Sequence, residues 1–488
     1  MLFAAAMRIM KNNEKFAAQR GKITDMDNRV AAFFEDLQGK KVAFLGLGGS
    51  NVPLAKIFAQ KGAVVFACDK RERAQLDDSG NELEALGITL RTGADYLRDL
   101  QVDMMFRTPG MRFHTQELEQ ARARGVAVTS EMEVFFELCP CKIYAVTGSD
   151  GKTTTTTIIS ELLKAAGKTV HLGGNIGRPL LPEVDRISRT DAAVVELSSF
   201  QLISMRRSPQ VAVVTNLSPN HLDMHKDMDE YVQAKRNLVL HQTADSKTVL
   251  NAESPLAISF APDARGQLFT FSSEKPCRYG AYLRGDGMLV MAENGTETEI
   301  LHCSEIRIPG RHNIENYLAA ITAVWREVSV EVICKVAKNF SGVEHRNELV
   351  RVVNGVSYYN DSIGTSPSRT ANGTLQLYGR KIILIAGGYD KQLCYDEIGS
   401  VIVDRVKILI LMGATADKIE HAVKKARNYK EGTPVILRAN CMEEAVALAE
   451  RSAQPGDIVS LSPASASFDL YENFAARGEH FKALVNRL

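Results

Sequence analysis

The clearest chemical signal in the sequence is the segment 144–153, which reads Tyr-Ala-Val-Thr-Gly-Ser-Asp-Gly-Lys-Thr. An apolar run enters a glycine-containing turn, and Lys152 and Thr153 then begin a helix that we expect to reach about Ala166. The N–H groups of such a turn bind phosphate oxygens, and the helix N-terminus adds partial positive charge. The lysine can reach the β- and γ-phosphates and the threonine can bind Mg²⁺. Because Val146 replaces the first glycine of the strict motif, the segment is a variant phosphate-binding loop, TGxxGKT.

Polar residues at two later strand ends suit the same nucleotide. Glu196 ends the apolar run 192–196, and ligands of open α/β sheets gather at the carboxyl ends of strands. A carboxylate there can bind the metal of a nucleotide, and a helix-capping role is the alternative. His221 and His225 are four residues apart, a spacing that could hold zinc on a helix. No third ligand is evident, so one histidine beside a phosphate-bound Mg²⁺ fits better.

Three further residues are ambiguous on position alone. Lys235 lies in a helical stretch fourteen residues after His221, where a surface lysine is the ordinary interpretation. Asn313 and Asn316 lie one helical turn apart and could bind an adenine or a phosphate, but helix capping explains Asn313 equally well. Arg346 follows a glycine at an expected hinge, where a guanidinium could bind phosphate with two hydrogen bonds.

Polar loops also follow the strands expected at both ends of the chain. Near the C-terminus they span 358–367, 386–391 and 461–469, and they should meet at one ligand; Lys391 and Ser467 suit a carboxylate. Near the N-terminus, 44–51 resembles the dinucleotide pattern GxGxxG with Asn51 in place of the last glycine, and Asp69 follows about twenty residues later. The missing glycine argues against NAD, whereas a nucleotide-sugar diphosphate needs only the helix N-terminus and the turn.

Three series of apolar, β-branched runs must position these residues. Such runs predict buried parallel strands linked by helices, and hence three α/β domains over residues 1–138, 139–342 and 343–488. Between Leu250 and Ile308 the segments shorten, and we expect 267–272, 278–283 and 288–292 to form a small antiparallel addition. The expected parallel strands are 41–45, 63–69 and 102–108; 142–146, 169–172, 192–196 and 211–216; and 381–385, 407–412, 433–437 and 457–461.

Composition limits the classes of function. The chain has 488 residues, of which 45% are hydrophobic and 24% charged, as in globular proteins. Its net charge of +1 provides no basic field for nucleic acid or an anionic membrane. No apolar run is long enough to cross a bilayer, and residues 1–38 read as an amphipathic extension rather than a secretory signal. Eight scattered cysteines are too few for a disulfide scaffold, so we expect a cytoplasmic protein.

Together the motifs resemble those of the Mur ligase family over nearly the whole chain. The resemblance implies a Rossmann-like N-terminal domain, a central P-loop ATPase-type domain and a Rossmann-like C-terminal domain. The markers, in chain order, are TGSDGKTT, GGNIG, VVELSSFQL, TNLSPNHLD, YVQAK, GRHNIEN, GVEHR and NDSIGTSP.

The resemblance implies ATP-dependent amide formation through an acyl phosphate, by a monomer that uses Mg²⁺, as two ions. The glycine-rich start and the ending LSPASASFDLYENFAARG imply UDP-N-acetylmuramoyl-L-alanine and D-glutamate as the substrates. Lys235 matches a family lysine that is carbamylated. Residues implied to act in catalysis or to bind metal are Lys152, Thr153, Glu196, His221 and Lys235; those implied to contact ATP are Thr147, Gly148, Ser149, Asp150, Gly151, Lys152, Thr153, Thr154, Asn313, Asn316, Arg346 and Asp361. Those implied to contact the other substrates are Leu47, Asp69, Arg71, Thr108, Asn175, Ser198, Thr365, Lys391, Ser467, Phe468 and Phe474.

One departure bears on the incoming amino acid. The family loop DSKATN reads Asp361-Ser-Ile-Gly-Thr-Ser here, so Ile363 stands at the position of a lysine. Two other enzymes therefore remain open: a Mur-type ligase that adds a different amino acid, and a ligase similar to folylpolyglutamate synthase. The glycine-rich first domain argues against the folate type. A nucleotide-gated binding protein without catalysis is the third alternative, against which the set Lys152, Glu196, His221 and Lys235 argues.

Overall fold

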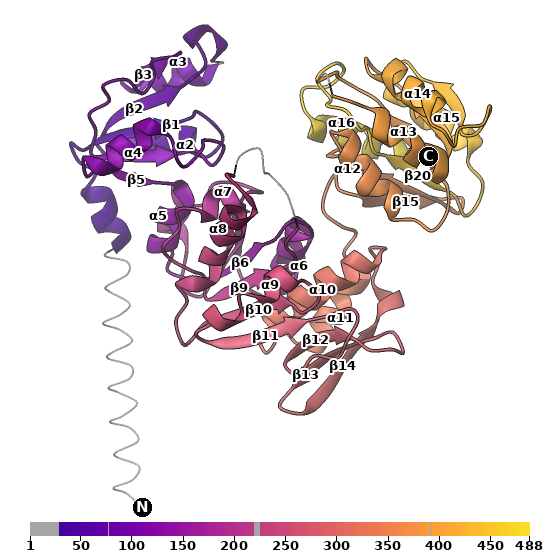
Figure 1. The fold of residues 1–488 in the computed structure, drawn as a ribbon, viewed down its shortest axis with the longest axis horizontal. Helices are drawn as coiled ribbons and strands as arrows, with labels where there is room; N and C mark the ends of the chain where they lie inside the picture. The colour runs from indigo at the N-terminus through magenta and orange to yellow at the C-terminus, as the bar shows by residue number, and fades with distance from the viewer. Residues whose placement is uncertain (1–28, 77, 219–224, 392) are drawn as a thin grey trace, which may run out of the picture. The chain divides into compact units, whose positions relative to one another are not determined.

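The computed structural model describes residues 29–76, 78–218, 225–391 and 393–488. The chain divides into two compact units (Figure 1). The first comprises Met1–Cys303 and Glu315–Val336, and the second comprises Ser304–Ile314 and Ala337–Leu488. No helix in the described ranges combines the length and the apolar character needed to cross a membrane.

The first unit begins with a parallel sheet in the order β3-β2-β1-β4-β5 (Figure 1). Val42 and Phe44 of β1 pack with α2, whereas the alternate residues Ala43 and Leu45 pack with α4, so helices cover both faces. The elements are β1 Lys41–Leu45, α2 Asn51–Gln60, β2 Val64–Asp69, η1 Arg73–Gln75, α3 Asp78–Ala85, β3 Thr89–Thr92, β4 Met104–Arg107, α4 Gln116–Ala123 and β5 Ala127–Thr129.

Part of the expected N-terminal extension belongs to the core of this sheet. Residues 29–35 are helical, and Val30, Phe34 and Leu37 are buried. The ring of Phe34 packs edge-on against Phe58 of α2, with 6.3 Å between centroids. Residues 1–28 lie outside the described ranges. Apolar side chains therefore join the chain to the first sheet well before β1.

A second sheet follows in the order β11-β10-β9-β6-β8-β7, and all its pairs are parallel. Its central strands are fully buried, as their continuous apolar runs predict. Helix α5 carries Met132, Phe135 and Phe136 into the core cluster that both sheets share. The elements are α5 Glu131–Leu138, β6 Lys142–Thr147, α6 Lys152–Ala165, β7 Val170–Gly174, η2 Leu181–Arg186, β8 Ala192–Glu196, α7 Ser199–Leu202, β9 Val211–Val214, α8 Met228–Leu240, β10 Lys247–Asn251, α9 Pro255–Ile258, η3 Ala261–Asp263 and β11 Gln267–Phe271.

The antiparallel addition exists, but one of its expected strands lies elsewhere. Residues 267–272 were expected to join it, whereas β11 pairs in parallel with β10 at the edge of the second sheet. An edge strand of an α/β sheet needs less apolar character than a central one. The short, mixed pattern of residues 267–272 therefore resembled that of the antiparallel segments. The addition is instead β12 Gly280–Leu283, β13 Met288–Glu293 and β14 Thr296–His302, followed by η4 Cys303–Glu305, α10 Arg311–Val324 and α11 Val330–Asn339.

The second unit is built on a sheet in the order β15-β16-β20-β17-β18-β19 (Figure 1). Only the β15–β16 pair is antiparallel, so the sheet is mixed. Ile383 and Ile385 of β17 pack toward α15 and α16, and Leu384 packs toward α13 and α14. The elements are β15 Glu348–Val353, β16 Val356–Asn360, α12 Pro367–Asn372, η5 Thr374–Gln376, β17 Ile382–Ala386, α13 Asp396–Arg405, β18 Val406–Leu411, α14 Ala416–Lys425, β19 Val435–Arg438, α15 Met442–Ser452, β20 Ile458–Leu461 and α16 Phe474–Val485.

Candidate active site

The expected phosphate-binding loop is a turn between β6 and α6, as the sequence predicts. Its backbone is held from the neighbouring strand end: Ser149 N donates to Asn216 O at 2.8 Å, and Asp150 N donates to Asn216 Oδ1 at 2.9 Å. The Thr215 hydroxyl donates to Asp150 O at 2.6 Å. Lys152 Nζ folds back over the turn and donates to Ser149 O at 2.8 Å. The loop is therefore held in place by the two residues that follow β9.

Glycine at position 148 is required by both conformation and space. Its φ is +151°, and a Cβ there would lie 1.9 Å from Thr215 Oγ1 and 3.0 Å from Asn216 O. Gly148→Ala should lower the free energy of unfolding by about 1–3 kcal/mol and weaken ATP binding, because the turn must move away from β9. Thermal unfolding and calorimetric titration with ATP measure the two effects.

Gly167→Ala is the matched control, because Gly167 also has a positive φ, +84°, but no atom within 4 Å of its added Cβ. The Gly167→Ala variant should also have a lower free energy of unfolding, because of its backbone strain, but its affinity for ATP should equal that of the wild type. Equal ATP affinities in the Gly148→Ala variant and the wild type would contradict the role given to the turn.

Oxygen-bearing side chains meet beside the loop. The Thr153 hydroxyl donates to Glu196 Oε2 at 2.7 Å, and Asn175 Nδ2 donates to Glu196 Oε1 at 2.7 Å. Glu196 is only 2% exposed, and its carboxylate bonds these side chains rather than capping α7. Hydroxyl and carboxylate oxygens are the ligands that Mg²⁺ prefers, so the donor set at the loop fits this ion.

The interpretation of Lys235 as a surface residue is wrong. Its position on α8 leaves it 2% exposed, and Nζ donates to Gly148 O at 2.8 Å and to Thr147 Oγ1 at 3.1 Å. Burial, reinforced by the charge of Lys152, holds the pKa of Lys235 well below its ordinary value. In the described part of the chain, its hydrogen-bond acceptors are a carbonyl and a hydroxyl rather than a carboxylate. Spacing along the chain gave no sign of this placement.

Tyr231 is a site residue that the sequence did not identify. Its hydroxyl lies 2.8 Å from Ser149 Oγ, and its ring centroid lies 4.9 Å from Lys235 Nζ. Both residues of α8 therefore line the back of the phosphate loop. The four-residue spacing between them on one helix face was the available signal.

The asparagines and histidines separate into different roles. Asn316 Oδ1 accepts from Thr155 Oγ1 at 3.1 Å and lies against Gly151, so it borders the loop. Asn313 Nδ2 instead donates to Pro309 O at 2.6 Å. His221 lies outside the described residues.

His225 has a protein partner at each ring nitrogen. Nε2 lies 2.8 Å from Ser199 Oγ and Nδ1 lies 3.2 Å from Glu230 Oε2. The ring also stacks on Phe200, with 5.2 Å between centroids. These contacts give His225 a packing role and argue against the paired-histidine zinc site.

The four residues expected near a uridine diphosphate lie together at the end of the first sheet. Asp69 Oδ2 accepts from Leu47 N at 2.9 Å, and Arg71 pairs with both carboxylate oxygens. Thr108 N donates to Leu45 O at 3.0 Å, which places Thr108 beside the glycine-rich turn. Burial alone would raise the pKa of Asp69, but the hydrogen bonds from Arg71 and Leu47 outweigh it and lower the pKa to about 2.

A cleft of about 380 Å³ lies within the first unit and joins this region to Asn175. Ser198 borders that end of the unit as the N-cap of α7, where its Oγ accepts from Gln201 N at 3.3 Å. Neither Arg107 nor Glu131 was singled out from the sequence, because each follows an apolar run without a recognisable motif. The cleft is lined by Gly49, Ser50, Arg107, Pro109, Ser130, Glu131, Met132, Gly174, Asn175, Gly177, Arg178, Pro179 and Gln201.

In the second unit the three strand-end loops converge, as expected. Buried Arg477 of α16 ties two of them, because it donates to Ser362 O at 2.9 Å and to Ala466 O at 2.9 Å. The third loop is joined by Tyr389 N, which donates to Ala466 O at 2.9 Å. Lys391 Nζ lies 5.8 Å from the ring of Phe468, which is 60% exposed.

The other expected residues of this unit lie in the same loops. Ser467 is buried, Phe474 is partly exposed at the start of α16, and Thr365 N donates to Ile363 O at 2.8 Å. Exposed Arg369 donates to Ile363 O at 3.3 Å, so a guanidinium lies beside the loop that lacks the family lysine.

Asp361 is deeper than its expected contact with ATP implies. It is 5% exposed, and its Oδ2 accepts from Thr374 Oγ1 and from Ser462 Oγ, both at 2.7 Å. Burial raises the pKa of Asp361 despite these bonds and the nearby charge of Arg346. Arg346 itself forms an isolated antiparallel bridge with Val343, just before β15 begins at Glu348.

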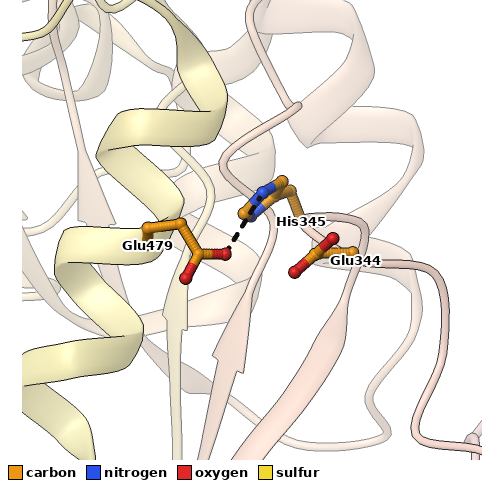
Figure 2. A group of neighbouring side chains, drawn as sticks. All are labelled: Glu344, His345 and Glu479. Atoms are coloured by element: carbon orange, nitrogen blue, oxygen red, sulfur yellow. Dashed lines mark ion pairs between the residues drawn. The ribbon is translucent and has the colours of Figure 1, made fainter. Parts of the chain in front are cut away.

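One group of histidine and carboxylate side chains in the described residues has the spacing of a metal site: Glu344, His345 and Glu479 (Figure 2). Lys482 Nζ lies 2.8 Å from Glu344 Oε1 and 3.0 Å from Glu479 Oε1. The ammonium already pairs with both carboxylates, so the group is an ion-pair network that ties α16 to the segment before Arg346.

Comparison with known protein families gives two matches. Residues 146–324 match the Mur ligase middle domain, and residues 345–465 match the Mur ligase glutamate ligase domain. The two matched segments contain the turn 147–151, Glu196, Lys235 and the loops 358–367 and 386–391 of the second unit.

Individual relatives are similar over their whole length. The chain is 50% identical over 466 residues to the UDP-N-acetylmuramoylalanine–D-glutamate ligase of Acetivibrio thermocellus, covering 95% of this chain and 100% of the relative. It is 47% identical, with the same coverage, to the enzyme of that name from Ruminiclostridium cellulolyticum. Among solved structures, the UDP-N-acetylmuramate-alanine ligase of Thermotoga maritima has a TM-score of 0.55 at 18% identity, covering 92% of this chain and 99% of that chain.

Proposed function

The chain belongs to the Mur ligase family, and we propose that it joins D-glutamate to UDP-N-acetylmuramoyl-L-alanine with ATP, a step of peptidoglycan precursor synthesis. The identity of 50% across the full length of a D-glutamate ligase carries this proposal. The pre-formed phosphate loop at the end of β6 supports it independently, because it supplies the ATP site that the reaction requires.

We assign three functional regions to the chain. Residues 1–138 bind the uridine nucleotide, residues 139–342 bind ATP and residues 343–488 bind the amino acid. Leu47, Asp69, Arg71 and Thr108 serve the nucleotide, and Asn175 and Ser198 serve the muramoyl end. The enzyme acts as a monomer on these three small substrates.

ATP lies on the turn Thr147–Gly151, where backbone N–H groups and Lys152 bind the phosphates. Thr154 on α6 and Asn316 on α10 complete the proposed ATP contacts within the first unit. Thr153 and Glu196 hold one Mg²⁺, and His221 and Lys235 a second. The ions supply positive charge that neutralises the phosphates and the oxygen that leaves.

Lys235 becomes a metal ligand only after modification, because an ammonium has no free electron pair. Its buried position beside a carbonyl and a hydroxyl disfavours the charged form, and a neutral amine can attack carbon dioxide. The N–C bond forms, one proton leaves to solvent, and the product is a carbamate with two oxygens. Those oxygens suit Mg²⁺.

The reaction then needs two displacements. The terminal carboxylate of the muramoyl substrate attacks the γ-phosphorus, ADP leaves, and an acyl phosphate results. The amine of D-glutamate attacks the acyl carbon, phosphate leaves, and the amine loses a proton to solvent. The protein's part is to hold the reactants and stabilise charge rather than to supply a nucleophile.

D-glutamate binds at the converged loops of the second unit through Thr365, Lys391, Ser467, Phe468 and Phe474. Lys391→Ala should raise the KM for D-glutamate about 10-fold, the scale of one charge-assisted hydrogen bond, and leave the KM for ATP unchanged. Steady-state phosphate release measures both constants.

Lys418→Ala is the matched control, because Lys418 forms an ion pair at 2.6 Å with Asp390, the residue just before Lys391. It should leave the KM for D-glutamate within twofold of wild type. Equal increases of the KM for D-glutamate in the two variants would mean that these lysines act only through the overall charge of this surface.

The proposed function is tested by a mass-resolved product assay with UDP-N-acetylmuramoyl-L-alanine, D-glutamate and ATP. The expected product has the mass of one added glutamate, with one phosphate released per product. Replacing D-glutamate by L-alanine, a diamino acid or L-glutamate, and the acid by a folate, should give no product. Turnover with another amino acid but none with D-glutamate would overturn the assignment.

A further inference from the structure

Arg107 forms an unusual bridge within the first unit. It ends β4, and its Nη1 donates to the carbonyls of Thr108 at 3.2 Å, Pro109 at 3.4 Å and Met111 at 2.7 Å. Its Nη2 donates to Phe200 O at 2.7 Å, across 93 residues of sequence. One guanidinium thus joins the loop that follows β4 in the first sheet to α7, which follows β8 in the second sheet.

Burial makes this bridge specific. Arg107 is 2% exposed, and its hydrogen-bond acceptors among the described residues are backbone carbonyls. Burial lowers its pKa to about 10, so it stays charged at neutral pH. A planar guanidinium bonded to fixed carbonyls on two sides sets the distance between them more strictly than a flexible ammonium would.

Both bridged segments border the 380 Å³ cleft. Pro109 and Arg107 line one side of it, and Gln201, which follows Phe200 on α7, lines the other. Ser198, at the proposed muramoyl end, caps the same short helix. Arg107 also donates to the carbonyl of Thr108, which lies at the proposed nucleotide end.

We propose that Arg107 is a positioning residue that fixes the spacing between the nucleotide-binding loop and the α7 end of the cleft. The inference rests on the proposed function, because a substrate with a nucleotide at one end and a reacting carboxylate at the other must contact both segments at once. Small errors in such spacing are costly for the alignment of reacting groups.

The decisive measurement compares two ligands in the Arg107→Met variant. Calorimetric titration should show that UDP-N-acetylmuramoyl-L-alanine binds about 10–100-fold more weakly than to wild type, the scale of one or two lost charge-assisted hydrogen bonds. UDP alone, which contacts only the nucleotide end, should change less than threefold, as should the KM for ATP. An equal loss for both ligands, or no loss, would overturn the proposal.

Arg122→Met is the matched control, because Arg122 donates to Phe113 O at 3.3 Å in the same loop region and does not reach α7 among the described contacts. It should leave the ratio of the two affinities unchanged. Should Arg107→Met fail to fold, Arg107→Lys keeps the charge without the planar fork and should show the same selective loss with a smaller size.

Hydrogen exchange tests the bridge without any substrate. Arg107→Met should speed amide exchange in both 108–113 and 199–205, whereas Arg122→Met should affect only the first segment. Unchanged exchange in 199–205 would overturn the proposal. A wild-type enzyme that makes no product from the proposed substrates would instead contradict the proposed function, and the exchange result would still decide the role of Arg107.

Discussion

Lys152→Ala is expected to lower kcat by about 10²–10³-fold, the scale seen when one preorganised charge is removed from a transition state. Lys152 begins α6, and its Nζ lies at the phosphate turn, 2.8 Å from Ser149 O. During transfer of the γ-phosphoryl group, charge grows on the phosphate oxygens, and no other described lysine or arginine extends from this turn. ATP-dependent phosphate release with all three substrates measures the loss.

Lys164→Ala controls for the effect of removing a lysine from the same helix. Lys164 lies in the last turn of α6 and pairs at 2.9 Å with Glu161 on the solvent side. It should retain wild-type kcat. Circular dichroism should show the same fold for both variants, because Lys152 lies at the start of α6 and alanine has a high helix propensity. Full activity of Lys152→Ala would refute the phosphate role of the loop.

Lys235→Ala should also abolish turnover, and short-chain carboxylates such as acetate or formate should restore part of it. The alanine leaves space beside Gly148 O and Thr147 Oγ1 in which a carboxylate can supply the oxygens of the lost carbamate. Mass spectrometry of the native protein should show an added 44 Da, the mass of carbon dioxide under the mechanism proposed here. Gln233→Ala, exposed on the same helix, should behave as wild type.

Lys235 also gives a pH test. Its pKa in the folded protein lies below the ordinary value of 10.5, so the unfolded chain binds more protons between the two values. Stability should therefore rise with pH across that window and lose this contribution as pH falls through the lower value. Lys235→Met removes the buried amine, so it should flatten this slope in denaturant titrations from pH 6 to 10, run in buffers free of carbon dioxide so that the wild-type amine is unmodified. Full activity of Lys235→Ala without added carboxylate would show that no modified lysine is needed.

Periodicity and strand-end chemistry predicted most of the parallel core. The runs at 192–196 and 142–146 became the buried strands β8 and β6, because continuous apolar segments can only be satisfied inside an α/β sheet. Short or mixed strands were missed: β3, β5, β10, β14 and β15 were not predicted, and 267–272 was assigned to the wrong sheet. The position of such a strand in its sheet depends more on which neighbouring strand has a free edge than on the residues of the strand itself.

At the site, motifs with local geometry were predicted well. The turn 147–151 and Thr153 follow from a strand, two glycines and a helix start that are adjacent in sequence. The buried contacts of Lys235 and Arg107 could not be predicted from the residues around them, because their partners lie 87 and 93 residues away.

The sequence by itself determined the phosphate-binding turn, the α/β class and the resemblance to a ligase family, because each depends on residues close together along the chain. Only the tertiary structure decided that Lys235 is buried against the turn, that Asp361 is buried beneath its loop and that Arg107 joins the loop after β4 to α7. Burial and hydrogen bonding are set by segments that meet through folding, so the residues next to a lysine or arginine do not reveal that its side chain is buried.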